Sequence, residues 1–66
     1  MENCIFSTFN SIDAALVKNA LEENKIETFV QNSNFAGLFP GSFEVKIFVK
    51  DEDVEESVEI IDTLFG

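Results

Sequence analysis

The most regular stretch of this sequence is residues 43–50, FEVKIFVK, in which apolar side chains recur at every second position. Successive side chains of a β-strand point to opposite faces of the sheet, so a period of two predicts a strand. Val45, Ile47 and Val49 share one face of this strand with the residue at its start. Phe48 lies on the other face, among glutamate and lysine.

Two other segments predict strands. Residues 3–9 are rich in β-branched and aromatic side chains and carry apolar groups on both faces, which indicates a strand covered on both sides. Residues 26–31 alternate, with Ile26 and Val30 on one face and Phe29 on the other.

Helical periodicity follows the first and the third strand. The first helix is expected to begin at a cap formed by Asn10 or Ser11 and to end near Asn24, which can adopt the left-handed conformation that often closes a helix. The second is expected to begin at Asp53, with Glu56 completing a capping box. The apolar stripes predicted to face the core are Ile12, Ala15, Leu16, Ala20 and Leu21 in the first helix, and Val54, Ser57, Val58, Ile61, Leu64 and Phe65 in the second.

The elements follow the order β-α-β-β-α in a single domain, residues 1–66. A right-handed crossover between the first two strands places both helices on one face of the sheet. With the third strand between the other two, the strand order is 1-3-2. The predicted class is α+β: a ferredoxin-like split βαβ fold that lacks the last strand, with a three-stranded antiparallel or mixed sheet. The first strand is then an edge with unpaired backbone groups.

The connection between the second and third strands is long and apolar. It lies within QNSNFAGLFPGS and covers residues 32–42, roughly twice the four to six residues that are usual in compact domains. Residues 32–34 can form local side-chain bonds that keep the chain out of the sheet. Phe35, Leu38 and Phe39 gain nothing from facing water, and Pro40 begins a turn signal.

These loop side chains are expected to fold over the open face of the sheet or over a partner. Phe29 and Phe48 are predicted to lie on that face, where together they would form an exposed apolar patch typical of interaction sites. The alternative is that the stems of glutamate and lysine side chains and the folded-back loop cover both rings.

The charge balance of the chain excludes several classes of partner. It has 13 acidic and 4 basic residues, for a formal net charge of -9. Nucleic acids and anionic membrane surfaces are bound through Lys and Arg, so neither is an expected partner. No apolar run approaches the roughly 18 residues of a membrane span, and the N-terminus does not resemble a signal peptide. Together with the single cysteine, these features favour the cytoplasm.

Catalytic and metal-binding groups are scarce in the sequence. Cys4 is the only cysteine and there is no histidine, which excludes a disulfide within the chain, a zinc site and a nucleophile paired with a histidine base. The carboxylates within residues 51–56 suit the start of a helix, and they do not complete an EF-hand, because Glu56 stands where that loop requires glycine. We therefore expect no enzyme activity, no cofactor and no bound metal.

Four segments of the chain resemble a known family. They are the opening strand ending in FSTFN, the helical stretch SIDAALVKNALEENKIE, the loop FAGLFPG and the final stretch FEVKIFVKDEDVEESVEII. Together they span nearly the whole chain and are similar to the putative prokaryotic signal transducing proteins, a family of small domains of unknown function. The resemblance implies a ferredoxin-like fold, similar in outline to PII signalling proteins, and a role in signal transduction. It supplies no catalytic residues.

The leading hypothesis is a non-enzymatic binding or regulatory module that acts through the apolar loop. Its partner is expected to be another protein or a second copy of the chain. In another version of this hypothesis the module senses a small ligand, although the chain lacks the basic residues that hold a phosphate. The alternative is a structural homo-oligomer whose loop or edge strand packs against its own copy. The predicted contact residues are Phe35, Leu38, Phe39 and Pro40, followed by Phe29 and Phe48.

Overall fold

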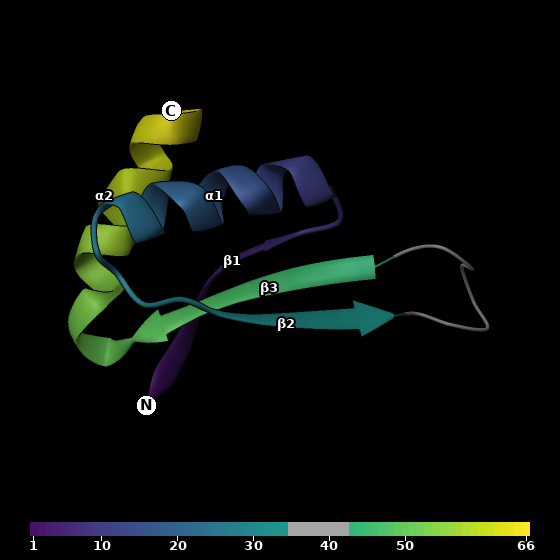
Figure 1. Ribbon diagram of the computed structural model, residues 1–66, viewed down its shortest axis with the longest axis horizontal. Helices are drawn as coiled ribbons and strands as arrows, with labels where there is room; N and C mark the ends of the chain where they lie inside the picture. Colours follow the sequence, from purple (N-terminus) through teal and green to yellow (C-terminus); the bar gives the residue numbers. More distant parts are fainter. Residues whose placement is uncertain (35–42) are drawn as a thin grey trace.

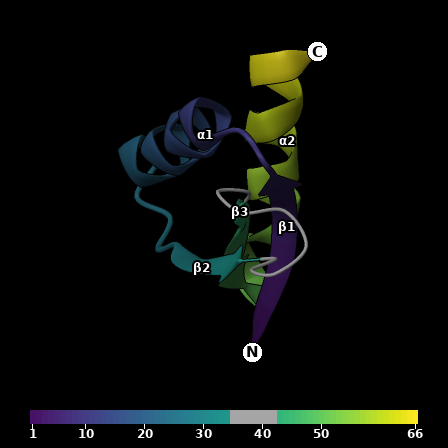
Figure 2. The same ribbon diagram turned by 90° about the vertical axis from the view of Figure 1, so that its right-hand side faces the viewer.

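The computed structural model describes residues 1–34 and 43–66 and confirms the predicted α+β fold. The described residues form a three-stranded sheet of order β1-β3-β2, in which β3 is antiparallel to both neighbours. Both helices lie on one side of the sheet (Figure 1). Seen end-on in Figure 2, α2 lies beside β1, which it contacts. The elements are β1 (Glu2–Thr8), α1 (Ser11–Glu23), β2 (Phe29–Asn34), β3 (Phe43–Lys50), the short 3-10 turn η1 (Asp51–Asp53) and α2 (Val54–Phe65).

The core lies between the helices and the central strand. Ile47 and Val49 of β3 are fully buried, as the alternation of that strand predicts. Val17 and Leu21 of α1 pack against them, together with Ile26, which follows the helix. The described core cluster is Ala14, Val17, Leu21, Ile26, Ile47 and Val49.

Strand β2 begins and ends three residues later than predicted. Residues 26–28 connect α1 to the sheet, and the strand continues through residues 32–34, which pair with Val45, Glu44 and Phe43 of β3. The prediction that residues 32–34 stay out of the sheet is therefore wrong. Backbone groups of β3 offer ladder partners at these positions, and this non-local pairing outweighs the local preference of Asn and Ser side chains.

A β-bulge in β1 explains why that strand is apolar at successive positions. The register with β3 shifts between Cys4 and Phe6, so Ile5 is the extra residue. A bulge places two residues of one strand opposite a single residue of its partner. As a result Ile5 and Phe6 both pack against the core cluster, and Cys4 is exposed. The strand is thus not covered on both sides, contrary to the prediction.

Helix α1 buries a face that shares Leu21 with the predicted stripe but is otherwise turned away from it. Ala14, Val17 and Leu21 are buried, whereas Ile12 is 70% exposed and Leu16 is 49% exposed. Apolar residues occur on two sides of this helix, so the periodicity alone permits either orientation. Contact with β3 selects the side that carries Val17 and Leu21.

Both ends of α1 are closed by local hydrogen bonds. Asn10 is the N-cap, and its side chain accepts bonds from the backbone N–H groups of Ile12 (2.8 Å) and Asp13 (3.4 Å). At the other end, the N–H groups of Lys25 and Ile26 donate to the carbonyls of Glu22 (2.9 Å) and Leu21 (3.0 Å). This is the Schellman pattern, which requires a left-handed residue just beyond the cap.

The left-handed residue at this end is Lys25, with φ 63°, and not Asn24, whose φ is -94°. The chain turns one residue later than predicted because Ile26 must reach Leu21. These two side chains are both buried in the core, and such an apolar contact commonly accompanies a Schellman end.

Helix α2 begins without the predicted capping box. Asp53 has φ -103° and ψ 0° and makes no side-chain capping bond. A capping side chain needs an extended backbone, and the turn η1 instead holds Asp53 in the helical region.

The buried face of α2 includes only part of the predicted stripe. Ser57 is fully buried, and Val54, Ile60 and Ile61 pack against the core. Val58, Leu64 and Phe65 are exposed, because α2 lies at the β1 edge of the sheet.

Candidate functional site

The face of the sheet opposite the helices carries a row of three apolar or sulfur-bearing side chains. Phe48 of β3 pairs with Cys4 of β1 on one side and with Phe29 of β2 on the other. The structure thus brings Phe29 and Phe48 together, as the sequence predicts. Both rings are half-buried, and Cys4 is exposed.

Charged and polar side chains flank this row on β3. The Lys50 ammonium lies 3.1 Å from a Glu27 carboxylate oxygen, and the Lys46 ammonium lies 3.9 Å from a Glu44 oxygen. The Ser7 hydroxyl donates to the other Glu44 oxygen over 2.6 Å. The hydrogen bond from Lys50 to Glu27, together with the charge of Glu27, raises the pKa of Lys50. Whether this face is an open apolar patch, or is covered by glutamate and lysine stems and the folded-back loop, stays a prediction, because the loop lies outside the described residues.

The other predicted contact residues, Phe35, Leu38, Phe39 and Pro40, lie outside the described residues. Their role therefore stays a prediction from the sequence.

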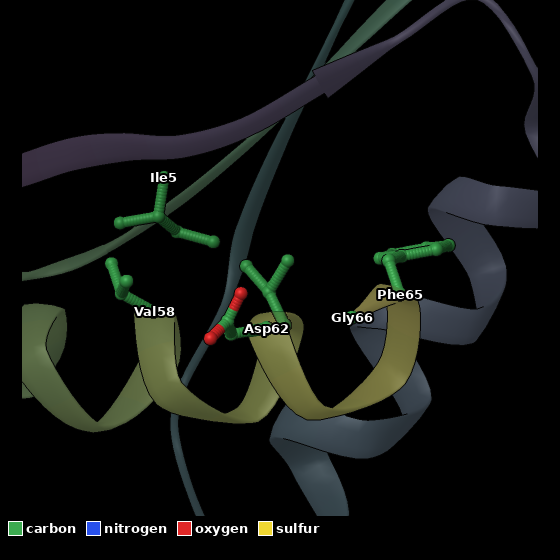
Figure 3. Close-up of a pocket in the computed structure, with 6 residues that line it drawn as sticks. Ile5, Val58, Asp62, Phe65 and Gly66 are labelled. Atoms are coloured by element: carbon green, nitrogen blue, oxygen red, sulfur yellow. The ribbon is translucent and has the colours of Figure 1, made fainter.

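A second surface lies between β1 and α2 and is hollowed into an open groove of about 250 Å³. Figure 3 shows Ile5 of β1 facing Val58 and Asp62 of α2, with Phe65 farther along the helix. Val58 and Phe65 are each 50% exposed. The groove therefore offers apolar side chains to a partner beside a carboxylate. Its lining is Ile5, Val58, Ile61, Asp62, Phe65 and Gly66.

Packing with β1 fixes the end of the groove. The ring of Phe65 stacks on that of Phe6, with centroids 5.6 Å apart and planes 3° from parallel. Because of the bulge, Phe6 faces the helices on the same side of β1 as Ile5, which lines the groove. The wall of the groove is therefore held by contacts between two elements.

The sequence does not reveal this groove directly. The apolar stripe predicted for the second helix places Val58 and Phe65 in the core. Alternation along the first strand assigns Ile5 and Phe6 to opposite faces of the sheet. The groove could have been inferred from one feature of the predicted fold, namely that the first strand is an open edge of the sheet. A helix over such an edge has no further strand to cover its outer side.

Within the described residues, no cluster of three or more His, Cys, Asp or Glu side chains could hold a metal ion. No described helix is long and apolar enough to cross a membrane. The groove itself offers apolar side chains next to the Asp62 carboxylate.

Comparison with known proteins assigns residues 3–64 to one family. No curated protein and no solved structure matches the sequence. A family model described as "Putative prokaryotic signal transducing protein" matches residues 3–64, which include every strand and helix described above apart from their outermost residues. The chain therefore belongs to the family of putative prokaryotic signal transducing proteins.

Proposed function

We propose that this protein is a non-enzymatic binding module that takes part in signal transduction in the cytoplasm by holding another protein. The observation that carries the proposal is the groove between β1 and α2. Its exposed residues Val58 and Phe65 lie on an ordered helix, and apolar side chains left open on a small domain are typical of interaction sites.

The apolar loop is a second part of the proposed contact surface. Phe35, Leu38, Phe39 and Pro40 supply the side chains there, and the half-buried Phe29 and Phe48 lie on the neighbouring sheet. Whether the loop and the groove hold the same partner is decided by changing each of them separately.

The test is affinity capture from the lysate of the source organism, with the captured proteins identified by mass spectrometry. The groove variant is Val58→Asp with Phe65→Asp, and the loop variant is Leu38→Asp with Phe39→Asp. The matched control is Ile12→Asp with Leu16→Asp, which adds the same charge to an exposed apolar stripe of α1 away from the groove. Circular dichroism first establishes that each variant is folded.

We expect a protein that is retained by the wild type and by the control, and lost by the groove variant. Its direct binding to the purified chain then confirms the contact. Equal retention of every protein by all four forms contradicts the proposal. So does an enzymatic activity that persists through extensive purification.

A homo-oligomer is the alternative, because the same exposed residues could pack against a second copy. The formal net charge of -9 on each copy opposes it. Solution mass measured over a range of concentrations separates the two: a monomer at high concentration excludes the oligomer.

A further inference from the structure

Strand β1 has one free side. Among the described residues it pairs with β3 alone, so the backbone groups along its other side have no ladder partner. Such an edge is a template for an added strand, and peptide-binding domains use edges in this way. The groove lies beside this strand, since Ile5 belongs to both (Figure 3).

The size of the groove limits what fits into it. Its volume is about 250 Å³, which is below the roughly 300–1,000 Å³ of most small-molecule sites. A groove of this size next to a strand edge suits one or two apolar side chains of an extended peptide. Ile5, Val58 and Phe65 would contact those side chains.

The charge beside the groove selects a basic occupant. Asp62 lines the groove, and Glu59 and Glu55 lie three and seven residues before it, on the same side of α2. Neither β1 nor α2 contains a lysine or arginine. Lys46 and Lys50 are paired with Glu44 and Glu27 on the other face of the sheet. An incoming strand therefore meets negative charge along the helix.

The same features disfavour a second copy as the occupant. A symmetric pair would place one acidic α2 near another, and like charges suppress such a contact. The bulge between Cys4 and Phe6 also interrupts the edge, and bulges are a known means of preventing edge-to-edge pairing of whole strands. A short peptide can pair with one part of the edge.

We infer that β1 and α2 together bind an extended, basic segment of another protein, which adds as a fourth strand along β1. Alternate side chains of that segment face the helix, apolar ones entering the groove and lysine or arginine meeting Asp62 and Glu59. This inference rests on the proposed binding function and names the chemistry of its partner.

The probe is the synthetic peptide acetyl-KTVTKTVT-amide, titrated into the isotope-labelled full chain and followed by the NMR shifts of backbone amides. Its lysines and valines share one face of a strand, and threonine favours the extended form. One control is acetyl-ETVTETVT-amide, with the opposite charge. The other is acetyl-KTVTKTVT-amide with N-methyl groups on each valine and on the threonine before it, which removes backbone donors on both sides of the strand.

We expect the basic peptide to shift amides of β1 and of α2 around Val58 and Asp62, and to bind more weakly at about 0.5 M salt than at about 0.05 M. The variant Glu59→Gln with Asp62→Asn should weaken binding about threefold to tenfold, as loss of two partly exposed charge contacts predicts. The variant Glu22→Gln with Glu23→Gln makes the same charge change on α1 and should leave the affinity unchanged.

Three results overturn the inference. Shifts confined to other surfaces, or no shifts, exclude β1 as the site. Equal binding of the acidic peptide excludes charge selection, and equal binding of the N-methylated peptide excludes strand addition. The basic peptide can fail to bind while the groove variant still fails to retain a protein that the wild type retains from the lysate. In that case the inferred basic strand is wrong and the proposed binding function stands.

Discussion

Lys25 and Ser57 hold unfavourable states that the surrounding packing imposes. Lys25 adopts a left-handed backbone conformation at the end of α1. Ser57 is fully buried in α2, and its hydroxyl has no hydrogen-bond partner among the residues that the structure describes. Each costs stability locally, and each follows from contacts made by neighbouring residues. Lys25 permits Ile26 to reach Leu21, and Ser57 occupies a helix position with no room for solvent.

Replacing Lys25 with glycine should stabilise the protein. Glycine adopts positive φ without a steric penalty, so Lys25→Gly should raise the free energy of unfolding by about 1 kcal/mol, as measured by urea denaturation. Asn24→Gly is the matched control, because φ at this position is negative and glycine gains nothing there. An equal gain from both variants would contradict the assignment of the left-handed position.

Removing the hydroxyl of Ser57 should also be tolerated. A buried polar group without a partner carries a desolvation cost, so Ser57→Ala should raise the free energy of unfolding by about 1 kcal/mol. Ser57→Val should lower it by about 1–3 kcal/mol, because the site is closed on all sides. A loss of stability in the alanine variant would mean that the hydroxyl does donate a bond, and would refute this account.

At the scale of elements, the orientation of α1 is the main departure from what the sequence predicts. The helix carries apolar side chains on two sides, and only one of them meets β3. The other leaves Ile12 and Leu16 facing outward. A substitution on each side measures which one belongs to the core.

Leu21→Ala should lower the free energy of unfolding by about 2–5 kcal/mol, because it opens a cavity among fully buried side chains. Ile12→Ala should change it by less than about 0.5 kcal/mol, since Ile12 is largely exposed. Thermal and urea unfolding followed by circular dichroism give both values. Comparable losses in the two variants would show that the outer stripe is covered in solution.

The features that the sequence predicts correctly are those with a local signal. Alternation over β3 and the helical periods after the first and third strands are enough for the element order. The sheet order 1-3-2 follows from that element order with the crossover rule and a split βαβ arrangement. The Asn10 cap is likewise local. The end of β2 depends on pairing with a distant strand, and propensity at residues 32–34 points the other way.

The candidate groove is harder to predict for the same reason. The bulge that turns Ile5 and Phe6 to one face is a property of the pairing between β1 and β3, and alternation within β1 does not reveal it. Phe29 and Phe48 could be predicted as neighbours, because the side chains of both strands alternate regularly between the two faces of the sheet. The sequence thus identifies one of the two surfaces described here.

At the scale of the whole molecule, the excess of negative charge dominates. The described residues form three ion pairs, all on the surface, and pairs of this kind contribute little stability. The radius of gyration is 12.3 Å, close to the Debye length of roughly 10 Å at 0.1 M salt. Acidic groups across the molecule therefore repel one another at low salt and are screened at high salt.

Salt should consequently stabilise this protein. Raising sodium chloride from about 0.01 M to about 0.5 M should increase the free energy of unfolding by on the order of 1 kcal/mol, or raise Tm by about 4–8 °C. The double variant Glu59→Gln with Asp62→Asn should be more stable at low salt and respond less to added salt. These two carboxylates lie toward the C-terminal end of α2, where the helix dipole also disfavours negative charge and no basic residue occurs in the last turn.

Glu55→Gln with Glu56→Gln is the matched comparison, because it makes the same charge change in the first turn of α2. There the helix dipole favours negative charge, so the gain in stability at low salt should be smaller than for the pair at the C-terminal end. Scanning calorimetry of the three forms at both salt concentrations measures the effect. A fall in Tm with salt would mean that the surface ion pairs outweigh the repulsion. In that case the negative field along α2 would also be too weak to select a basic partner.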